Sequence, residues 1–168
     1  MHAAEMPELS MRDWVRLTGR EPAPFGPASD GIVWRPKDRH VGVWDGDELI
    51  AAAGVVVAEV EVAGAAFDVV GVGGLVVRPE YRGRHLMPLV ADPVGRMAEA
   101  AGPDRAMIFC DERLVRVYEG RGYTRIADPV WVDQPEGRIE MPIPAMWRPL
   151  RPGATWPRGT VQVRGEPF

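Results

Sequence analysis

The residues with the clearest chemical potential lie in one run, Leu75-Val-Val-Arg-Pro-Glu-Tyr-Arg-Gly-Arg-His-Leu86. Its apolar start is typical of a strand, and the pattern after Arg-Pro becomes helical. A helix start leaves backbone N–H groups without partners, and the helix dipole adds partial positive charge there. Gly83 lets the chain bend so that these groups converge, while Arg82 and Arg84 add cationic side chains. The run therefore predicts a pyrophosphate site, although an ordinary strand-to-helix turn with solvated arginines explains it equally well.

A second run favours the first interpretation. The segments "LVVRPEYRGRHLMPLV" and "DERLVRVYEGRGYTRI" together resemble the two acetyl-CoA-binding segments of the GNAT acetyltransferase superfamily. In that family a strand ending in a Val-x-Pro-like stretch leads into Arg/Gln-x-x-Gly-x-Gly/Ala. Farther along the chain follows an Asn-x-x-Ala-x-x-x-Tyr-x-x-x-Gly-Phe/Tyr-like helix and turn. The pair of segments, in this order, identifies the chain as a suspected member of the superfamily.

The resemblance implies a role for each matching position. The backbone from Arg82 to Met87 would hold the CoA pyrophosphate, and the strand at Leu75 would align the pantetheine arm like an added strand. Tyr118 stands where the family's tyrosine acts as general acid on the departing thiolate. The implied cofactor-binding residues are Leu75, Val76, Val77, Arg82, Gly83, Arg84, His85, Leu86, Met87 and Asp111, and the implied catalytic residue is Tyr118. Acetyl-CoA would be the co-substrate, and no metal is expected.

The two segments depart from the family pattern at three positions. His85 and Met87 replace two small residues, and Asp111 replaces the usual Asn. The aminoglycoside 2′-N-acetyltransferase branch also has larger residues in this loop, and its "RGQRL" stretch resembles Arg82-Gly-Arg-His-Leu86. We therefore still expect CoA binding, and the loop is most similar to that branch.

The general base is the least defined part of the expected site. Gly71 and Gly73 stand where many family members carry a catalytic glutamate. An acceptor amine must lose a proton before it attacks, and a carboxylate usually takes that proton through water. The candidate carboxylates are Glu59, Glu61, Asp68 and Asp111, each of which also fits a solvated strand or cap position. A water held by backbone carbonyls near Gly71–Gly74 is another option.

Other reactive residue types in the sequence have structural explanations. Tyr118 as general acid is roughly matched to a thiolate leaving group, but a tyrosine with its ring in the core fits the same position. His85 fits a phosphate contact or a surface residue, and Cys110 fits a buried strand end. The histidines and the cysteine have no metal-ligand spacing. Lys37 is the only lysine, which we attribute to codon bias.

The sequence pattern around these residues predicts a series of helices and strands. The pattern predicts a helix with Leu9, Trp14 and Leu17 on one side that ends at Gly19, and then a Pro/Gly-rich loop from Glu21 to Asp30. We expect strands at His40–Trp44, Leu49–Val62, Ala66–Val77, Ala106–Cys110, Tyr123–Ile126 and Arg138–Ile143, and helices from Leu86 to Ala101 and from Asp111 to Glu119. Pro93 either kinks the first of these helices or restarts it.

This order predicts an α/β (α+β) protein of the GNAT fold, with a mixed, mostly antiparallel sheet of about six or seven strands flanked by helices. One acyltransferase domain is expected over residues 1–147. A Pro/Gly-rich tail over residues 148–168 would pack on the same domain. Trp156, Phe168 and the terminal carboxylate would cover one wall of the acceptor site, or the tail would only cover a sheet edge.

Net charge, cysteine content and apolar runs limit the partners and the cellular location that we expect. The net charge of −4 argues against nucleic-acid binding. The single cysteine allows no internal disulfide and fits a reducing cytoplasm. The first residues lack the apolar run of a signal peptide, and no apolar run reaches membrane-spanning length. We therefore expect a cytoplasmic monomer or homodimer without a nucleic-acid or membrane partner.

The expected function is direct transfer of acetyl from acetyl-CoA to a primary amine of a small molecule, such as an aminated antibiotic or metabolite. A strand N–H near Val76 would stabilise the oxyanion. The alternative is a non-catalytic CoA-binding regulator or a degenerate GNAT partner protein, because Gly71 and Gly73 replace the expected carboxylate.

Overall fold

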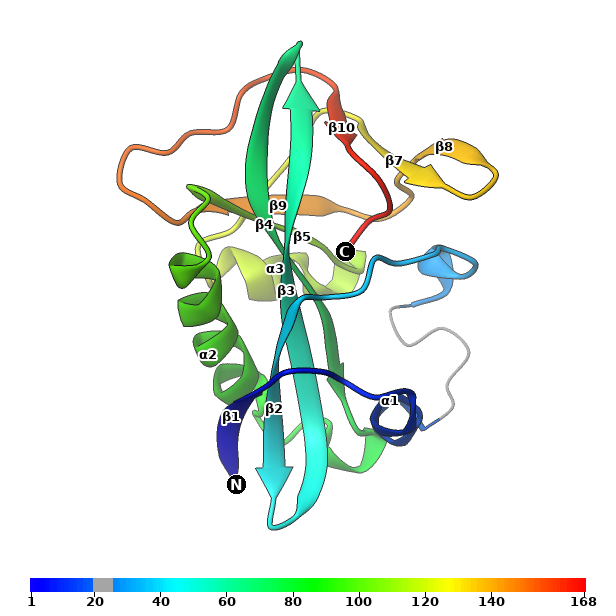
Figure 1. Ribbon diagram of the computed structural model, residues 1–168, viewed down its shortest axis with the longest axis vertical. Coiled ribbons are helices and arrows are strands. Elements are labelled where there is room, and N and C mark those ends of the chain that lie inside the picture. Colours follow the sequence, from blue (N-terminus) through cyan, green and yellow to red (C-terminus); the bar gives the residue numbers. More distant parts are fainter. Residues whose placement is uncertain (20–25) are drawn as a thin grey trace.

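The computed structural model describes residues 1–19 and 26–168, and a strongly twisted sheet runs through its whole length (Figure 1). The strand order is β6-β9-β5-β4-β3-β10-β7-β8, and β2 joins β3 and carries β1 at its outer edge. The strands are β1 His2–Met6, β2 Arg39–Asp45, β3 Glu48–Val62, β4 Ala65–Val77, β5 Arg105–Phe109, β6 Thr124–Arg125, β7 Val130–Gln134, β8 Gly137–Glu140, β9 Ala145–Pro149 and β10 Val161–Val163. All ladders are antiparallel except β4–β5 and β7–β10. The predicted mixed α/β fold is therefore confirmed.

Strands β2, β3 and β4 form the antiparallel meander that the sequence predicts. Gly46 and Asp47 turn the chain from β2 to β3, since Asp45 still pairs with Glu48, and Gly46 has a φ of +59°. At the β3–β4 turn both Ala63 and Gly64 have positive φ, 50° and 84°, as a two-residue hairpin turn of this kind requires. The long β3 pairs with β2 along its first half and with β10 near its end.

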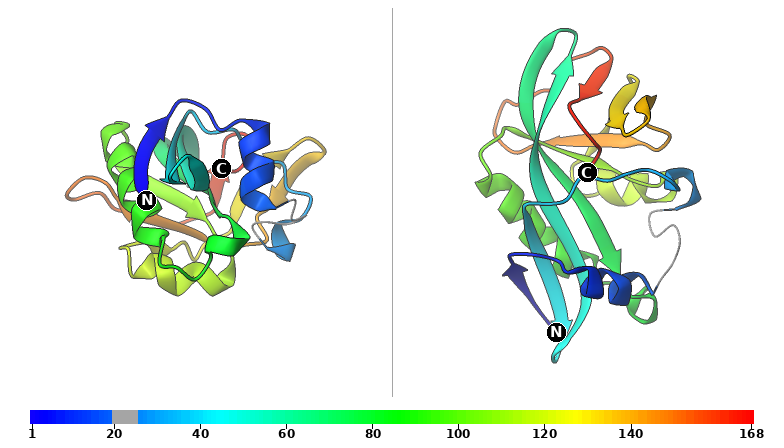
Figure 2. Two further views of the ribbon diagram at one scale, coloured as in Figure 1. Left: turned by 90° about the horizontal axis from the view of Figure 1, so that it is seen from below. Right: turned by 45° about the vertical axis from the view of Figure 1, so that its right-hand side comes forward.

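Helices α1 (Met11–Thr18) and α2 (Met87–Ala100) cover opposite faces of this meander (Figures 1 and 2). Ser10 caps α1 by accepting a hydrogen bond from the Asp13 N–H, and Gly19 ends it in the left-handed conformation. Leu17 of α1 packs with Ala52 on one face, whereas α2 packs against a core that includes the neighbouring residue Ala51. This alternation follows from the two-residue period of a strand.

Helix α2 is one continuous helix, which settles how the chain accommodates its prolines. Pro88 lies in its first turn, where a proline has no hydrogen bond to lose. Pro93 lies inside the helix, and the helix does not restart there.

The second predicted helix is a short 3₁₀ turn, Glu112–Leu114, followed by α3, Val115–Glu119. As predicted, the Asp111 side chain caps this segment, by accepting from the Arg113 N–H.

The sheet has more strands than the six or seven expected, since the described residues form ten. Strands β1, β7, β9 and β10 were not predicted, and β6 and β8 are shorter than the predicted strands at these positions. Strand β10 has three residues and lies between β3 and β7, so its pairing partners are distant in sequence. Short strands of this kind depend on tertiary pairing more than on local pattern.

The ladder between β4 and β5 is short, and its end defines the functional region. The two strands pair in parallel from Val70–Ala106 to Val72–Ile108. Beyond that point β4 continues to Val77 and remains paired with β3, whereas the chain after β5 turns toward the segment before β9, where the Cys110 N–H donates to the Pro144 carbonyl. The two central strands therefore diverge, and one edge of β4 faces the gap.

None of the described helices is long and apolar enough to cross a membrane.

Candidate active site

A cavity of about 420 Å³ opens where β4 and β5 diverge. Its lining includes Gly73, Gly74, Leu75, Asp111, Tyr118 and Phe168. A larger cleft of about 820 Å³ between α2 and α3 shares Val72, Leu75 and Tyr118 with this cavity. A third cavity of about 400 Å³, beneath α1, shares Trp34 and Gly74 with it. The three spaces meet around one short piece of β4.

The predicted general acid, Tyr118, lies at the junction of the first two spaces. Its ring is half-buried and packs edge-to-face on Tyr123, with 5.7 Å between ring centroids. Burial, and then the neighbouring Cys110 and Tyr123, raise the pKa of Tyr118 well above its ordinary value. The phenol is therefore protonated at neutral pH, as a general acid requires, and the raised pKa makes it a weaker acid than an ordinary tyrosine.

The predicted pantetheine strand presents backbone more than side chains to the cavity. Leu75 lines both the cavity and the cleft. Val76 is buried on the opposite face, against Leu17 and Ala52, and Val77 is partly buried against the main core. Of these three residues, only Leu75 can offer its side chain to a ligand in the cavity.

The predicted phosphate loop precedes α2. Gly83 has a φ of +76°, and His85 has a φ of 56°, which is unusual for a residue with a side chain. Arg84 lies over the Tyr81 ring at 4.8 Å, and the Arg82 Nε donates to the Val77 carbonyl at 3.0 Å. Leu86 is buried at the start of the helix, and Met87 lines the cleft between α2 and α3. The helix start has no capping side chain, so its N–H groups face the cleft without a cap.

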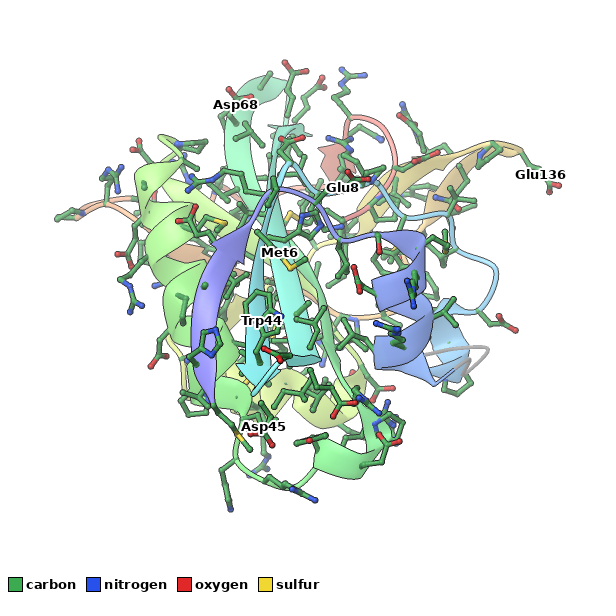
Figure 3. All side chains as sticks on the ribbon, turned by 60° about the horizontal axis from the view of Figure 1, so that its bottom comes forward. Met6, Glu8, Trp44, Asp45, Asp68 and Glu136 are labelled. Carbon is green, nitrogen blue, oxygen red and sulfur yellow. The ribbon has the colours of Figure 1, made fainter. Side chains whose placement is uncertain are left out.

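Asp111 is the only one of the four candidate carboxylates that lines the cavity. Its side chain accepts from the backbone and the guanidinium of Arg113, each at 2.9 Å, and these bonds lower the pKa of Asp111. Glu59 and Asp68 are exposed register partners far along the β3–β4 hairpin (Figure 3). Glu61 forms an ion pair with Arg164. A weakly basic, already bonded Asp111 makes a poor proton acceptor.

The structure places the main chain of Phe168 in the cavity. Phe168 is 1% exposed. A Cβ on Gly71 would lie 2.5 Å from the Cδ2 atom of its ring, and a Cβ on Gly73 would lie 2.6 Å from its carbonyl carbon. Neither glycine has a positive φ, so both are required for space and not for backbone conformation. The Phe168 main chain thus occupies the volume that a side chain at position 73 would fill.

The segment Arg35–Lys37 holds this end of the chain. The Arg35 N–H donates to the Pro167 carbonyl at 2.7 Å, and the Arg35 guanidinium donates to the Arg164 carbonyl. The Lys37 stem crosses the sheet at Gly54 and Gly73, and its ammonium donates to the Arg35 carbonyl at 2.7 Å. Burial, and then Arg35, lower the pKa of Lys37 to about 8. The sequence analysis did not assign Lys37 to the site, and the only feature that could have pointed to it is that it is the single lysine.

Other expected contributors lie elsewhere. Trp156 packs against Phe67 and Trp147, with centroids 5.7 and 5.6 Å away, and is not among the residues that line the three spaces. Part of the Glu21–Asp30 loop, residues 21–25, is outside the described residues, while Gly26 lines the cavity. Cys110 is buried, and burial raises its pKa to about 11, so it is no nucleophile. Within residues 1–19 and 26–168, no group of His, Cys, Asp and Glu is placed to hold a metal.

A sequence model of the family described as "Acetyltransferase (GNAT) domain" matches residues 32–126, which is more than half of the chain. The chain belongs to the GNAT acetyltransferase family. The match begins before β2 and ends after β6, so it covers the meander, α2, β5 and Tyr118. The C-terminal strands and Phe168 lie outside it.

Solved GNAT structures share the fold at low sequence identity. Escherichia coli ElaA is 19% identical, with a TM-score of 0.58 over 88% of this chain and 98% of that one. An aminoglycoside 6′-N-acetyltransferase complexed with coenzyme A is 14% identical, with a TM-score of 0.59 over 92% and 100%. A GNAT protein from Kribbella flavida is 29% identical, but the match covers 52% of this chain and 22% of that one at a TM-score of 0.46. No match is found among curated protein sequences. The resemblance to the 2′-acetylating branch stays a prediction.

Proposed function

We propose that this GNAT protein transfers an acetyl group from acetyl-CoA to a primary amine of a small molecule within a ternary complex. The observation that carries the proposal is the meeting of three elements at one cavity. These are the diverging edge of β4, the protonated phenol of Tyr118 and the main-chain carbonyl of Phe168. A donor strand, an acid and a polar group that can hold a proton-accepting water are the parts that direct acyl transfer to an amine requires.

The cleft between α2 and α3 suits CoA. The uncapped start of α2 would bind the pyrophosphate through its N–H groups and dipole, with Arg82 and Arg84 nearby. The pantetheine arm would run along the free edge of β4 from Gly73 to Val77, as an added strand. Because Leu75 and Tyr118 line both the cleft and the cavity, a thioester that reaches along this edge would arrive beside the phenol. A backbone N–H near Val76 would stabilise the oxyanion.

A water held by backbone carbonyls near Gly71–Gly74 would be the general base. By the family resemblance a glutamate on β4 is the base in many members, and here Gly71 and Gly73 leave its space to Phe168, whose carbonyl would help to hold the water. The water would take a proton from the acceptor ammonium. The amine would attack the thioester carbon, the C–S bond would break, and Tyr118 would protonate the CoA thiolate.

The acceptor would be a small amine that enters by the side of the cavity opposite the CoA cleft. The adjoining cavity beneath α1 adds about 400 Å³ of space lined in part by Trp14 and Trp34, which is sufficient for a small molecule. The aminoglycoside 6′-N-acetyltransferase among the structural neighbours supports an aminated antibiotic or metabolite. We further propose a cytoplasmic monomer or homodimer that acts without nucleic acid or membrane.

A thiol-release assay tests the function. The purified chain is mixed with acetyl-CoA and a panel of amines that includes aminoglycosides, polyamines and amino acids. At least one amine should release free CoA at a rate that saturates with both substrates and falls strongly in the Tyr118→Phe variant. If acetyl-CoA binds but no amine in a broad panel is acetylated, the chain is a non-catalytic CoA-binding protein.

A further inference from the structure

Lys37 is the only lysine of the chain, and its side chain extends into the site region. A Cβ on Gly54 would lie 2.8 Å from the Lys37 Cβ, and a Cβ on Gly73 would lie 3.0 Å from the Lys37 Cε. The aliphatic part of the Lys37 side chain therefore crosses β3 and β4, and it has room there because Gly54 and Gly73 have no side chain. Its amine ends beside β4, next to the point where that strand leaves β5.

The amine is suited to act as a nucleophile. Its pKa of about 8 leaves roughly a tenth of the molecules with a neutral amine near pH 7, against less than about a thousandth for an ordinary lysine. The ammonium has one hydrogen bond, to the Arg35 carbonyl, among those that the described residues show. Rotation about the last bonds of the Lys37 side chain would break only this hydrogen bond, whose acceptor is a neutral backbone carbonyl, and would free the amine to react.

The position of Lys37 matches that required of an acceptor amine. The Lys37 Cε and the Phe168 carbonyl carbon both lie within 3.0 Å of the same point, the Cβ position of Gly73. Gly73, Gly74 and Leu75 line the cavity together with Tyr118. The cavity beneath α1, which Lys37 lines, shares Gly74 and Trp34 with the central cavity. An amine beside Gly73, at the start of the proposed thioester edge, therefore lies next to the space that the acetyl group would enter.

We propose that Lys37 is a self-acetylation site: with acetyl-CoA bound and no acceptor present, its amine takes the acetyl group in the protein's own active site. This inference rests on the proposed function. The Lys37 nitrogen forms the new C–N bond, the thioester C–S bond breaks, and the nitrogen gives its proton to a water in the cavity. Tyr118 supplies the proton that converts the CoA thiolate to the thiol.

The modification would limit the enzyme's own turnover. Acetylation adds an uncharged group that must lie in the acceptor space. This added bulk opposes binding of the next amine, so the enzyme would lose activity when acetyl-CoA is abundant and the acceptor is scarce. An acceptor that fills the cavity would protect Lys37.

The test is mass spectrometry of the full chain after incubation with acetyl-CoA alone. We expect the mass of one acetyl group to be added, and peptide mapping to place it on Lys37 and not on the N-terminal amine. Lys37→Arg keeps the charge and removes the reactive amine, and it should stay unmodified. Tyr118→Phe should slow the modification by about 10²-fold or more. The chain unfolded in urea controls for chemical acetylation and should react far more slowly than the folded chain.

The outcomes separate this inference from the proposed function. If the chain binds acetyl-CoA and acetylates an added amine while Lys37 stays unmodified, self-acetylation is wrong and the function stands. Equal modification rates in the folded chain, the Tyr118→Phe variant and the unfolded chain would also overturn it, because the reaction would be ordinary chemical acetylation. If the chain neither binds acetyl-CoA nor releases CoA with any amine, the proposed function itself fails.

Discussion

The carbonyl carbon of Phe168 lies 2.6 Å from the position that a Cβ on Gly73 would take. The Phe168 main chain thus fills the space of an internal side chain on the central strand. Strand β10, which leads to it, pairs with both β3 and β7, and the Arg35 N–H donates to the Pro167 carbonyl at 2.7 Å. A carbonyl fixed in this way is placed by the whole sheet and not by one flexible side chain.

A glutamate rescue tests the proposed base. Deleting Phe168 removes the carbonyl that would help to hold the proton-accepting water, and it should lower kcat by about 10²–10⁴-fold, the range for a lost general base. Adding Gly73→Glu to the deletion should recover part of the activity, because the glutamate enters the vacated space. Gly73→Gln in the same background is the matched control and should recover none. Full activity of the deletion variant would place the base elsewhere.

The local parts of the fold could be predicted from the sequence, whereas the distant pairings could not. The meander, α1 and α2 have clear periodicity and turn residues such as Asp45 and Gly46. The three residues of β10 have too little pattern to indicate a strand, and their pairing depends on segments far away in sequence. Gly71 and Gly73 were recognised as departures from the family. That the distant residue Phe168 fills their space is a tertiary relationship, and no local motif encodes it.

Tyr118→Phe tests the general acid. The variant should keep its affinity for CoA and lose about 10²–10⁴-fold in kcat, because the ring still packs on Tyr123 while the proton donor is gone. Binding is measured by calorimetry and turnover by thiol release. Tyr123→Phe is the matched control, since it removes a phenol from the packed partner, and it should stay within a few-fold of the parent. Equal losses in both variants would reduce Tyr118 to a packing residue.

Acetyl-CoA should stabilise the folded chain. A ligand at about 100 times its dissociation constant adds roughly 2.7 kcal/mol to the free energy of unfolding, which raises Tm by several degrees in a domain of this size. The shift is measured by scanning fluorimetry with CoA, acetyl-CoA and dephospho-CoA. A chain that shows no shift at millimolar CoA does not use it as substrate, and the proposed function would then fail.

Gly71→Ala should destabilise the fold through Phe168. The new methyl group would lie 2.5 Å from the ring of a fully buried side chain, so the ring or the strand must move. Overpacking of this kind costs about 1–3 kcal/mol, measured by urea unfolding. Gly120→Ala is the control, since its nearest contact would be an ordinary 3.5 Å and its φ of −61° suits alanine. If Gly71→Ala is as stable as the control, Phe168 is not packed on β4 in solution.

The Cys110 thiol should be nearly inert at neutral and mildly alkaline pH. Burial, and then Glu112 and Asp111, raise its pKa to about 11. Since the thiolate is the reactive form, a pKa near 11 leaves about 10²-fold less thiolate at pH 8 than a pKa near 9 does. Iodoacetamide labelling of the native chain at pH 8 should therefore be slower than labelling of the urea-unfolded chain by at least that factor.

The raised pKa of Cys110 also determines how the stability of the fold depends on pH. The unfolded thiol ionises at lower pH than the folded one, so the stabilisation is complete below pH 9 and is lost as the pH rises toward 11. Comparing the unfolding free energy of the parent with that of Cys110→Ala over this range isolates the contribution. Rapid native labelling at pH 8 would show that the thiol is exposed and that the turn after β5 opens in solution.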